Sequence, residues 1–207
     1  PLYDFGANQD FTVECRVRTG TAADVAIVGN KDWESGVFPG FVFSFEYPVG
    51  PGWKVNIADG VNRTDLEIGG AIADNQWHTL SVTFDRDGDM SMYEDGLLLG
   101  AADISSIQSI NSGTGLFFGA DNFGAYQFDG AIAEVRVWNE VLSPSEIANY
   151  SCLELDGGHP SSGNLIGHWK MNEGTGETSV PDYSGNNNNG IQVNTVWSEP
   201  GAEYEYD

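Results

Sequence analysis

Hydrophobic and polar residues alternate in short runs over the first 140 positions of the chain. In the run FTVECRVR, from Phe11 to Arg18, the odd positions are apolar and the even positions are polar. Because successive side chains of a strand point to opposite faces, this pattern predicts a strand at 11–17 with one face in a core. Similar runs between turn-forming residues predict strands at 25–28, 40–45, 53–57, 79–84, 90–94, 97–99, 116–118 and 131–138. This pattern favours an all-β protein with two packed antiparallel sheets.

Two local signals predict a turn and a helix. Asp95-Gly96 separates two apolar runs and is typical of a two-residue hairpin turn with positive φ angles. Ser143-Pro144-Ser145-Glu146 combines a serine N-cap, a proline at the first helical position and a glutamate three residues after the cap. It predicts one short helix, with 147–152 as its body, which we expect to close an open end of the sandwich.

The chain changes character after residue 152. Residues 153–163 are rich in turn formers and predict a connector between residues 1–152 and a C-terminal segment, 164–207. That segment opens with a predicted strand whose residues Leu165, Trp169 and Met171 share one face. We expect it to pack on the same sandwich, because about 45 residues are marginal as an independent core. The alternative is that it begins a second module.

The composition of the chain limits the kinds of molecule that it can bind. The 207 residues include 31 acidic and 8 basic side chains, a net charge of −23. Because this charge repels polyanions, we expect neither nucleic acid nor anionic lipid as a binding partner. No apolar run approaches the roughly 18 residues of a membrane span, so we expect no insertion into a membrane. Cys15 and Cys152 form either one disulfide or two free thiols.

Four motifs, QWHTLSVTFD (76–85), MYEDG (92–96), FDGAIAEVRVWN (128–139) and LSPSEI (142–147), occur in that order. Together they resemble the laminin-G-like domains of the concanavalin A-like lectin/glucanase superfamily. The resemblance implies a two-sheet antiparallel jelly-roll sandwich whose curved face or rim loops bind ligands. Such domains occur in secreted and surface proteins of Bacteroidetes-type bacteria. The resemblance therefore also implies that the chain is an extracellular, cell-surface or periplasmic module within a longer polypeptide.

The C-terminal segment is similar to the opening strand and first loop of such domains, although here it comes last. This resemblance implies a structural Ca²⁺ held by oxygen atoms of Asp182, Asn186 and Asn188 and completed by Glu134. Ala133 stands where an aspartate is usual. The alternative is an asparagine-rich turn whose side chains satisfy its own backbone. A second acidic run, DRDGD (85–89), has glycine in its fourth position, and we interpret it as a hairpin turn.

Catalysis in the glucanase branch of the superfamily needs two carboxylates on one strand face, written Glu-x-Asp-x-x-Glu. That spacing is absent from the sequence, and Glu154-Leu155-Asp156 in the predicted connector is its nearest approach. We therefore predict that the chain is not an enzyme and has no catalytic residues.

Carbohydrate recognition relies on aromatic rings that stack on sugars, with nearby polar groups that bind hydroxyls. The candidates are the aromatic and polar residues of predicted loops: Asp32, Trp33, Tyr47, Trp53, Asp121, Asn122 and Tyr126. We predict a non-catalytic carbohydrate-binding or adhesive module whose partner is a glycan or cell-surface polysaccharide. The alternatives are that Trp33 folds back on the sandwich, and that the chain is a structural or protein-interaction domain of a larger secreted hydrolase with no sugar site.

Overall fold

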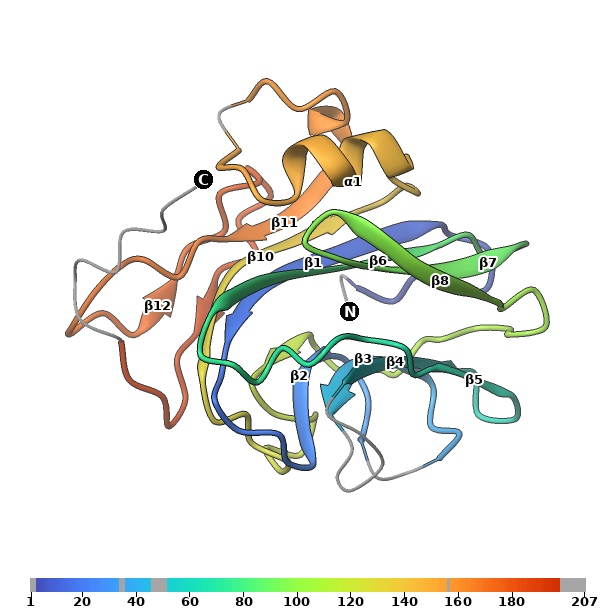
Figure 1. Cartoon of the computed structure of the whole chain (residues 1–207), viewed down its shortest axis with the longest axis horizontal. Coiled ribbons are helices and arrows are strands. Elements are labelled where there is room, and N and C mark those ends of the chain that lie inside the picture. Colours follow the sequence, from blue (N-terminus) through green and yellow to red (C-terminus); the bar gives the residue numbers. More distant parts are fainter. Residues whose placement is uncertain (1–2, 34–35, 46–51, 156, 198–207) are drawn as a thin grey trace.

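Two antiparallel sheets face each other in the computed structural model, which describes residues 3–33, 36–45, 52–155 and 157–197 (Figure 1). The six-stranded sheet has the order β11 (Leu165–Trp169), β10 (Ala131–Trp138), β1 (Phe11–Arg18), β6 (Trp77–Phe84), β7 (Asp89–Glu94) and β8 (Leu97–Asp103). The five-stranded sheet has the order β5 (Arg63–Leu66), β4 (Trp53–Ala58), β3 (Gly40–Phe45), β2 (Val25–Gly29) and β9 (Phe117–Phe118). The predicted all-β jelly-roll sandwich is confirmed.

The core lies between the inner faces of the two sheets. Phe11 stacks on Phe84 at 4.2 Å between ring centroids and on Phe5 at 3.9 Å. Each large apolar side chain buried here stabilises the fold by about 1.5–3 kcal/mol. The predicted strands all form, while β5 was missed, since its sequence RTDL carries two charges and little alternation. It lies at the edge of its sheet, where charged residues are ordinary.

The predicted turn and helix are both present. Asp95 and Gly96 have φ angles of 49° and 79°, as the hairpin turn requires. Helix α1 (Pro144–Tyr150) has the predicted capping box, with Ser143 as its N-cap and Glu146 at its third position. The predicted place of the helix was wrong. It covers the outer face of the six-stranded sheet, where Ile147 packs in a cluster with Tyr93 and Trp138 (Figure 1).

Strand β11 extends the six-stranded sheet beside β10. Trp169 lies opposite Val135 and belongs to the core. A register shift at Val137/Trp138 then places Leu165 opposite Trp138, and Leu165 packs against the outer cluster instead of the core. The prediction that Leu165 shares a face with Trp169 was therefore wrong, because the irregular pairing reverses the alternation.

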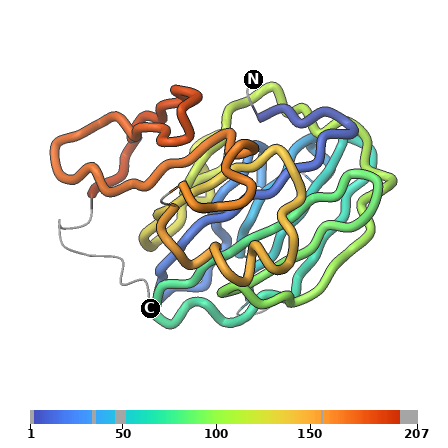
Figure 2. The backbone as a smooth tube through the Cα atoms, turned by 90° about the horizontal axis from the view of Figure 1, so that it is seen from above, coloured from blue at the N-terminus to red at the C-terminus, as the bar shows by residue number. Residues whose placement is uncertain are grey.

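The rest of the C-terminal segment contains a short 3₁₀ turn before β11 (Ser162–Asn164) and a two-stranded ribbon after it, β12 (Ser179–Val180) and β13 (Gly190–Ile191). Figure 2 shows residues 172–197, in orange to red, as a lobe at one side of the sandwich. No helix in the described part of the chain is long and apolar enough to cross a membrane.

The two cysteines are free thiols. Cys15 is buried in the core, and burial raises the pKa of its thiol. The sulfur of Cys152 lies 3.5 Å from the hydroxyl of Thr79, on the outer face of the six-stranded sheet. The acidic run at 85–89 joins β6 to β7 as a turn, in which the backbone N–H of Gly88 donates to the carbonyl of Asp85.

Candidate functional site

The outer face of the five-stranded sheet is covered by loops. Val42 and Ser44 of β3 and their partners Asn56 and Lys54 of β4 alternate with core residues and therefore point away from the core. All four side chains are nevertheless buried. Residues that follow β2 provide part of the cover, because Lys31 reaches down to the sheet and donates to Asn56 Oδ1 at 2.9 Å.

Two cations attach this covering loop, of which residues 30–33 and 36–39 are described, to the sheet. The ammonium group of Lys31 also donates to the carbonyl of Gly36 at 3.2 Å, and Arg63 of β5 donates to the same carbonyl at 3.1 Å. Burial, assisted by the charge of Arg63, lowers the pKa of Lys31 to about 8. Arg63 also forms an ion pair with Asp65 on the same strand. The loop is thus held by one buried and two partly buried hydrogen bonds.

Two aromatic rings from different loops meet over this face. Trp33 and Tyr126 stack with their ring centroids 4.4 Å apart and their planes inclined by 28°. The ammonium group of Lys54 lies 5.7 Å from the Trp33 ring. The carbonyl of Tyr126 accepts a hydrogen bond from Ala26 N–H, which places the second loop, residues 121–127, beside β2. Trp33 and Tyr126 thus form a stacked pair in which both residues are partly exposed.

The second loop is shaped by a buried carboxylate. Asp121 Oδ1 accepts hydrogen bonds from the backbone N–H groups of Phe123 and Ala125, at 2.9 and 2.8 Å. Asp121 is therefore a turn residue that positions Tyr126, while its neighbour Asn122 is partly exposed.

The structure brings together Trp33 and Tyr126 from the predicted set, with Asp32 next to Trp33 in the chain and Asn122 in the same loop as Tyr126. Trp53 requires a correction. It is the first residue of β4, fully buried in the core, and its indole N–H donates to Glu94 at 2.8 Å, so its ring cannot reach a sugar. Tyr47 lies outside the described residues.

Sequence reasoning missed two aromatic residues of the same loops. Phe38 is 54% exposed and Phe123 is 74% exposed. Both satisfy the rule that selected Trp33, namely an aromatic residue in a loop next to polar residues. Lys54 was also missed, because nothing in a strand sequence says which residue of another loop will lie over it.

The predicted calcium loop is organised around backbone groups. Asp182 Oδ1 accepts from the N–H groups of His168 and Ser184, at 3.0 and 2.9 Å, and its Oδ2 accepts from that of Asn188 at 2.9 Å. Partial burial raises the pKa of Asp182, but these hydrogen bonds outweigh it and hold the pKa below its usual value. The side-chain amides of Asn186 and Asn188 donate to carbonyls of the edge strand β11, including that of Ile166.

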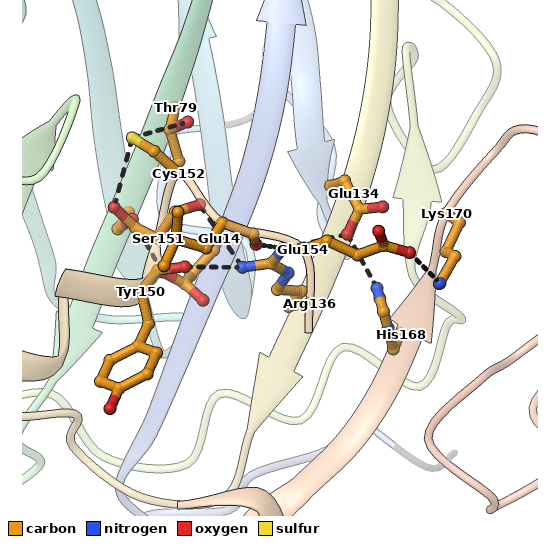
Figure 3. A network of polar contacts seen from close by, with 12 residues as sticks. Glu14, Thr79, Glu134, Arg136, Tyr150, Ser151, Cys152, Glu154, His168 and Lys170 are labelled. Atoms are coloured by element: carbon orange, nitrogen blue, oxygen red, sulfur yellow. Dashed lines mark hydrogen bonds and ion pairs between the residues drawn. The ribbon is translucent and has the colours of Figure 1, made fainter. Parts of the chain in front are cut away.

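Glu134, the fourth predicted ligand, belongs to a buried polar network (Figure 3). It interrupts the pairing of β10 with a φ of 50°, and its Oε2 accepts from Arg136 at 3.0 Å and lies 2.9 Å from His168 Nε2. A calcium ion at this oxygen would lie beside a guanidinium group. These four residues do not fit calcium as they are arranged, and the geometry supports the interpretation of a loop that satisfies its own backbone.

We expect calcium to raise the melting temperature of the chain no more than magnesium does at the same ionic strength. Asp182→Ala should lower the stability by about 1–3 kcal/mol with or without calcium, because it leaves backbone donors without their acceptor. Thermal unfolding of both proteins in the two salts is the measurement. A rise that is specific for calcium and absent from the variant would restore the calcium site.

The comparisons with known proteins agree with this fold. The family model Laminin_G_3, of the concanavalin A-like lectin/glucanases superfamily, matches residues 3–148. The chain therefore belongs to this family, as its motifs predicted.

Neuronal pentraxin-2 from Cavia porcellus is 31% identical in an alignment of 151 residues that covers 64% of this chain. The match spans 34% of that protein, about a third of its length.

Three solved structures have a similar fold. A protein of Bacteroides ovatus ATCC 8483, provisionally assigned to carbohydrate binding, has a TM-score of 0.66 and 19% identity over 92% of this chain and 55% of its own. The sialidase module CBM40 of Ruminococcus gnavus, bound to α2,3-sialyllactose, has a TM-score of 0.56 and 16% identity over 70% of this chain and 83% of its own. The SAP-like pentraxin of Limulus polyphemus has a TM-score of 0.55 and 16% identity over 75% of this chain and 74% of its own.

Proposed function

We propose that this chain is a non-catalytic, extracellular carbohydrate-binding module within a longer polypeptide. Its ligand would meet residues 30–33 and 36–39 of the first loop and the second loop at 121–127, above the outer face of the five-stranded sheet. The observation that carries the proposal is the contact between Trp33 and Tyr126, two stacked rings that are both partly open to solvent. A ring held in this way loses little conformational freedom when a sugar stacks on it.

The surroundings of the ring pair supply the other groups that sugar recognition needs. Asp32 would offer its carboxylate to hydroxyl groups and Asn122 its amide nitrogen, since Oδ1 of Asn122 is buried, and the exposed Phe123 extends the apolar surface. The Ruminococcus gnavus neighbour is bound to α2,3-sialyllactose. Its likeness to this chain supports a glycan ligand by analogy of fold alone.

Charge favours neutral glycans over polyanionic ones. Five of the eight basic residues of the sequence are buried, namely Arg16, Lys31, Lys54, Arg86 and Arg136. The surface is therefore dominated by acidic side chains, which repel polyanions at long range.

Tyr126→Ala is expected to weaken glycan binding by roughly tenfold or more, equivalent to about 1.4 kcal/mol, because it removes the stacking ring and leaves the core intact. A glycan array identifies the ligand, and calorimetry with that ligand measures the loss. Tyr183→Ala is the matched control, since Tyr183 is a half-exposed tyrosine of the C-terminal lobe. Equal glycan affinity in the parent chain and both variants would show that the binding site does not include Tyr126.

The alternative is a structural or protein-interaction domain of a larger secreted hydrolase. If no neutral or acidic glycan on the array binds, with or without calcium, this alternative replaces the carbohydrate-binding proposal. Cleavage of a polysaccharide by the purified chain, abolished by changing one carboxylate, would instead make it an enzyme.

A further inference from the structure

A histidine with a carboxylate at each ring nitrogen lies where β6 begins and β7 ends. Nδ1 of His78 is 2.8 Å from Asp95 Oδ2, and its Nε2 is 3.2 Å from Asp74 Oδ1. A neutral imidazole carries only one N–H. One of the two contacts therefore needs a second proton or a metal ion between the nitrogen and the oxygen.

The carboxylates around this histidine are oriented by other donors. Asp95 Oδ1 accepts from the backbone N–H of Thr79 at 2.7 Å. Glu94 Oε2 accepts from the indole of Trp53 and from the N–H of Gly70, both at 2.8 Å. Each carboxylate thus has one oxygen fixed by the fold, which orients the remaining oxygen.

Three ligand groups converge at this place. One ligand atom each of His78, Glu94 and Asp95 lies within 4.8 Å of the other two. Asp74 contacts the histidine as well, so three carboxylates surround one imidazole. Among the ion pairs of the described residues, Asp74 and Asp95 pair with His78 and with no lysine or arginine. A divalent cation would offset this excess of negative charge.

We propose that His78, Glu94 and Asp95 form a zinc-binding site. One imidazole nitrogen and two carboxylate oxygens suit Zn²⁺, with water as the fourth ligand, whereas calcium and magnesium prefer oxygen ligands alone. Nδ1 would bind the metal, and Nε2–H would donate to Asp74. A carboxylate on the second nitrogen is the usual support for a metal-binding histidine.

The position gives the metal a structural consequence. Glu94 belongs to the six-stranded sheet and accepts a hydrogen bond from Trp53 of the five-stranded sheet. Zinc would join β6, the β7–β8 turn and, through Glu94, the opposite sheet. Binding to the folded chain alone raises the melting temperature.

The test uses the whole chain, freed of metals with EDTA and titrated with ZnCl₂ by calorimetry. We expect about one zinc ion per chain and a higher melting temperature, with no such rise in MgCl₂ at matched ionic strength. Co²⁺ should give the visible absorption of a four-coordinate site that contains an imidazole nitrogen.

Two conservative variants keep the fold while removing ligands. Asp95→Asn retains an acceptor for Thr79 and a residue suited to the hairpin turn, and Glu94→Gln retains an acceptor for Trp53. Each should weaken zinc binding by roughly tenfold or more. Asp89→Asn, which removes the same charge at the other end of β7, should leave it unchanged.

Zinc binding that is absent, or equal in all these variants, would overturn the proposal and leave His78 as a protonated partner of two aspartates. Tyr126→Ala should bind zinc as the parent chain does. A failure of the glycan proposal therefore does not affect this one.

Discussion

Removal of residues 164–207 is expected to produce a chain that aggregates or unfolds far below the melting temperature of the intact protein. Trp169 of β11 is buried in the core, with its ring 5.7 Å from that of Tyr3 and 5.1 Å from that of Phe118. Its loss and the loss of the neighbouring apolar contacts cost about 1.5–3 kcal/mol for each large side chain. Truncation also exposes the edge of β10, which can then pair with another chain.

The size of this effect follows from the total stability of a domain. A loss of about 5 kcal/mol is comparable with the whole free energy of unfolding of a marginally stable domain, about 5–15 kcal/mol. Thermal unfolding and light scattering of residues 1–163 are the measurements. A chain that ends at Gln192 is the control, because it keeps β11, β12 and β13.

The outcome also decides between the two interpretations of the C-terminal segment. Unchanged unfolding of the truncated chain would show that the segment belongs to a second module. A soluble but strongly destabilised chain would show that it completes the sandwich.

The alternation of apolar and polar residues predicted which side chains of a strand face the core. It did not predict that the polar side chains on the opposite face are buried as well. In β1 the apolar positions Val13 and Val17 are core residues, as expected. The polar positions Thr12, Glu14 and Arg16 are also buried. Their cover comes from distant parts of the chain. Glu14, for example, accepts from the indole of Trp138, which lies 124 positions further on. Periodicity is a local signal and carries no information about such partners.

The sequence predicted those site residues that can be recognised from their residue type and their position in a loop. Trp33 and Tyr126 belong to loops, and the structure places their rings in contact. Trp53 follows a run rich in proline and glycine, which made it a loop candidate, although it begins a buried strand. The position of Glu134 depends on a register shift at a positive φ angle without glycine, and no sequence signal marks it.

Arg136→Met is expected to destabilise the protein by about 3–5 kcal/mol. The guanidinium of Arg136 is 1% exposed and donates to the carboxylate of Glu134 and to the carbonyls of Tyr150, Ser151 and Leu153 (Figure 3). Methionine fills much of the space but leaves Glu134 without its guanidinium partner, so that the ring of His168, 2.9 Å away, remains beside the carboxylate. A buried charge without its partner destabilises the folded state by more than the intact ion pair stabilises it.

The pH dependence separates this charge effect from a loss of packing. Burial raises the pKa of Glu134, but the hydrogen bond from His168 and the charge of Arg136 outweigh it, so the pKa lies below its usual value. The stabilisation by Glu134 is therefore present above about pH 4.3, the ordinary carboxyl pKa, and is lost as the pH falls through the lowered value. The free energy of unfolding of Arg136→Met should consequently differ less from that of the parent chain below about pH 4 than at about pH 7.

Urea unfolding at both pH values measures the difference, and Glu134→Gln is the companion variant. The double variant with Met at 136 and Gln at 134 should be more stable than Arg136→Met alone, because no unpaired carboxylate remains in the interior. If the two changes are instead additive, Arg136 acts through the loop carbonyls that it binds, and the pairing with Glu134 adds nothing to stability.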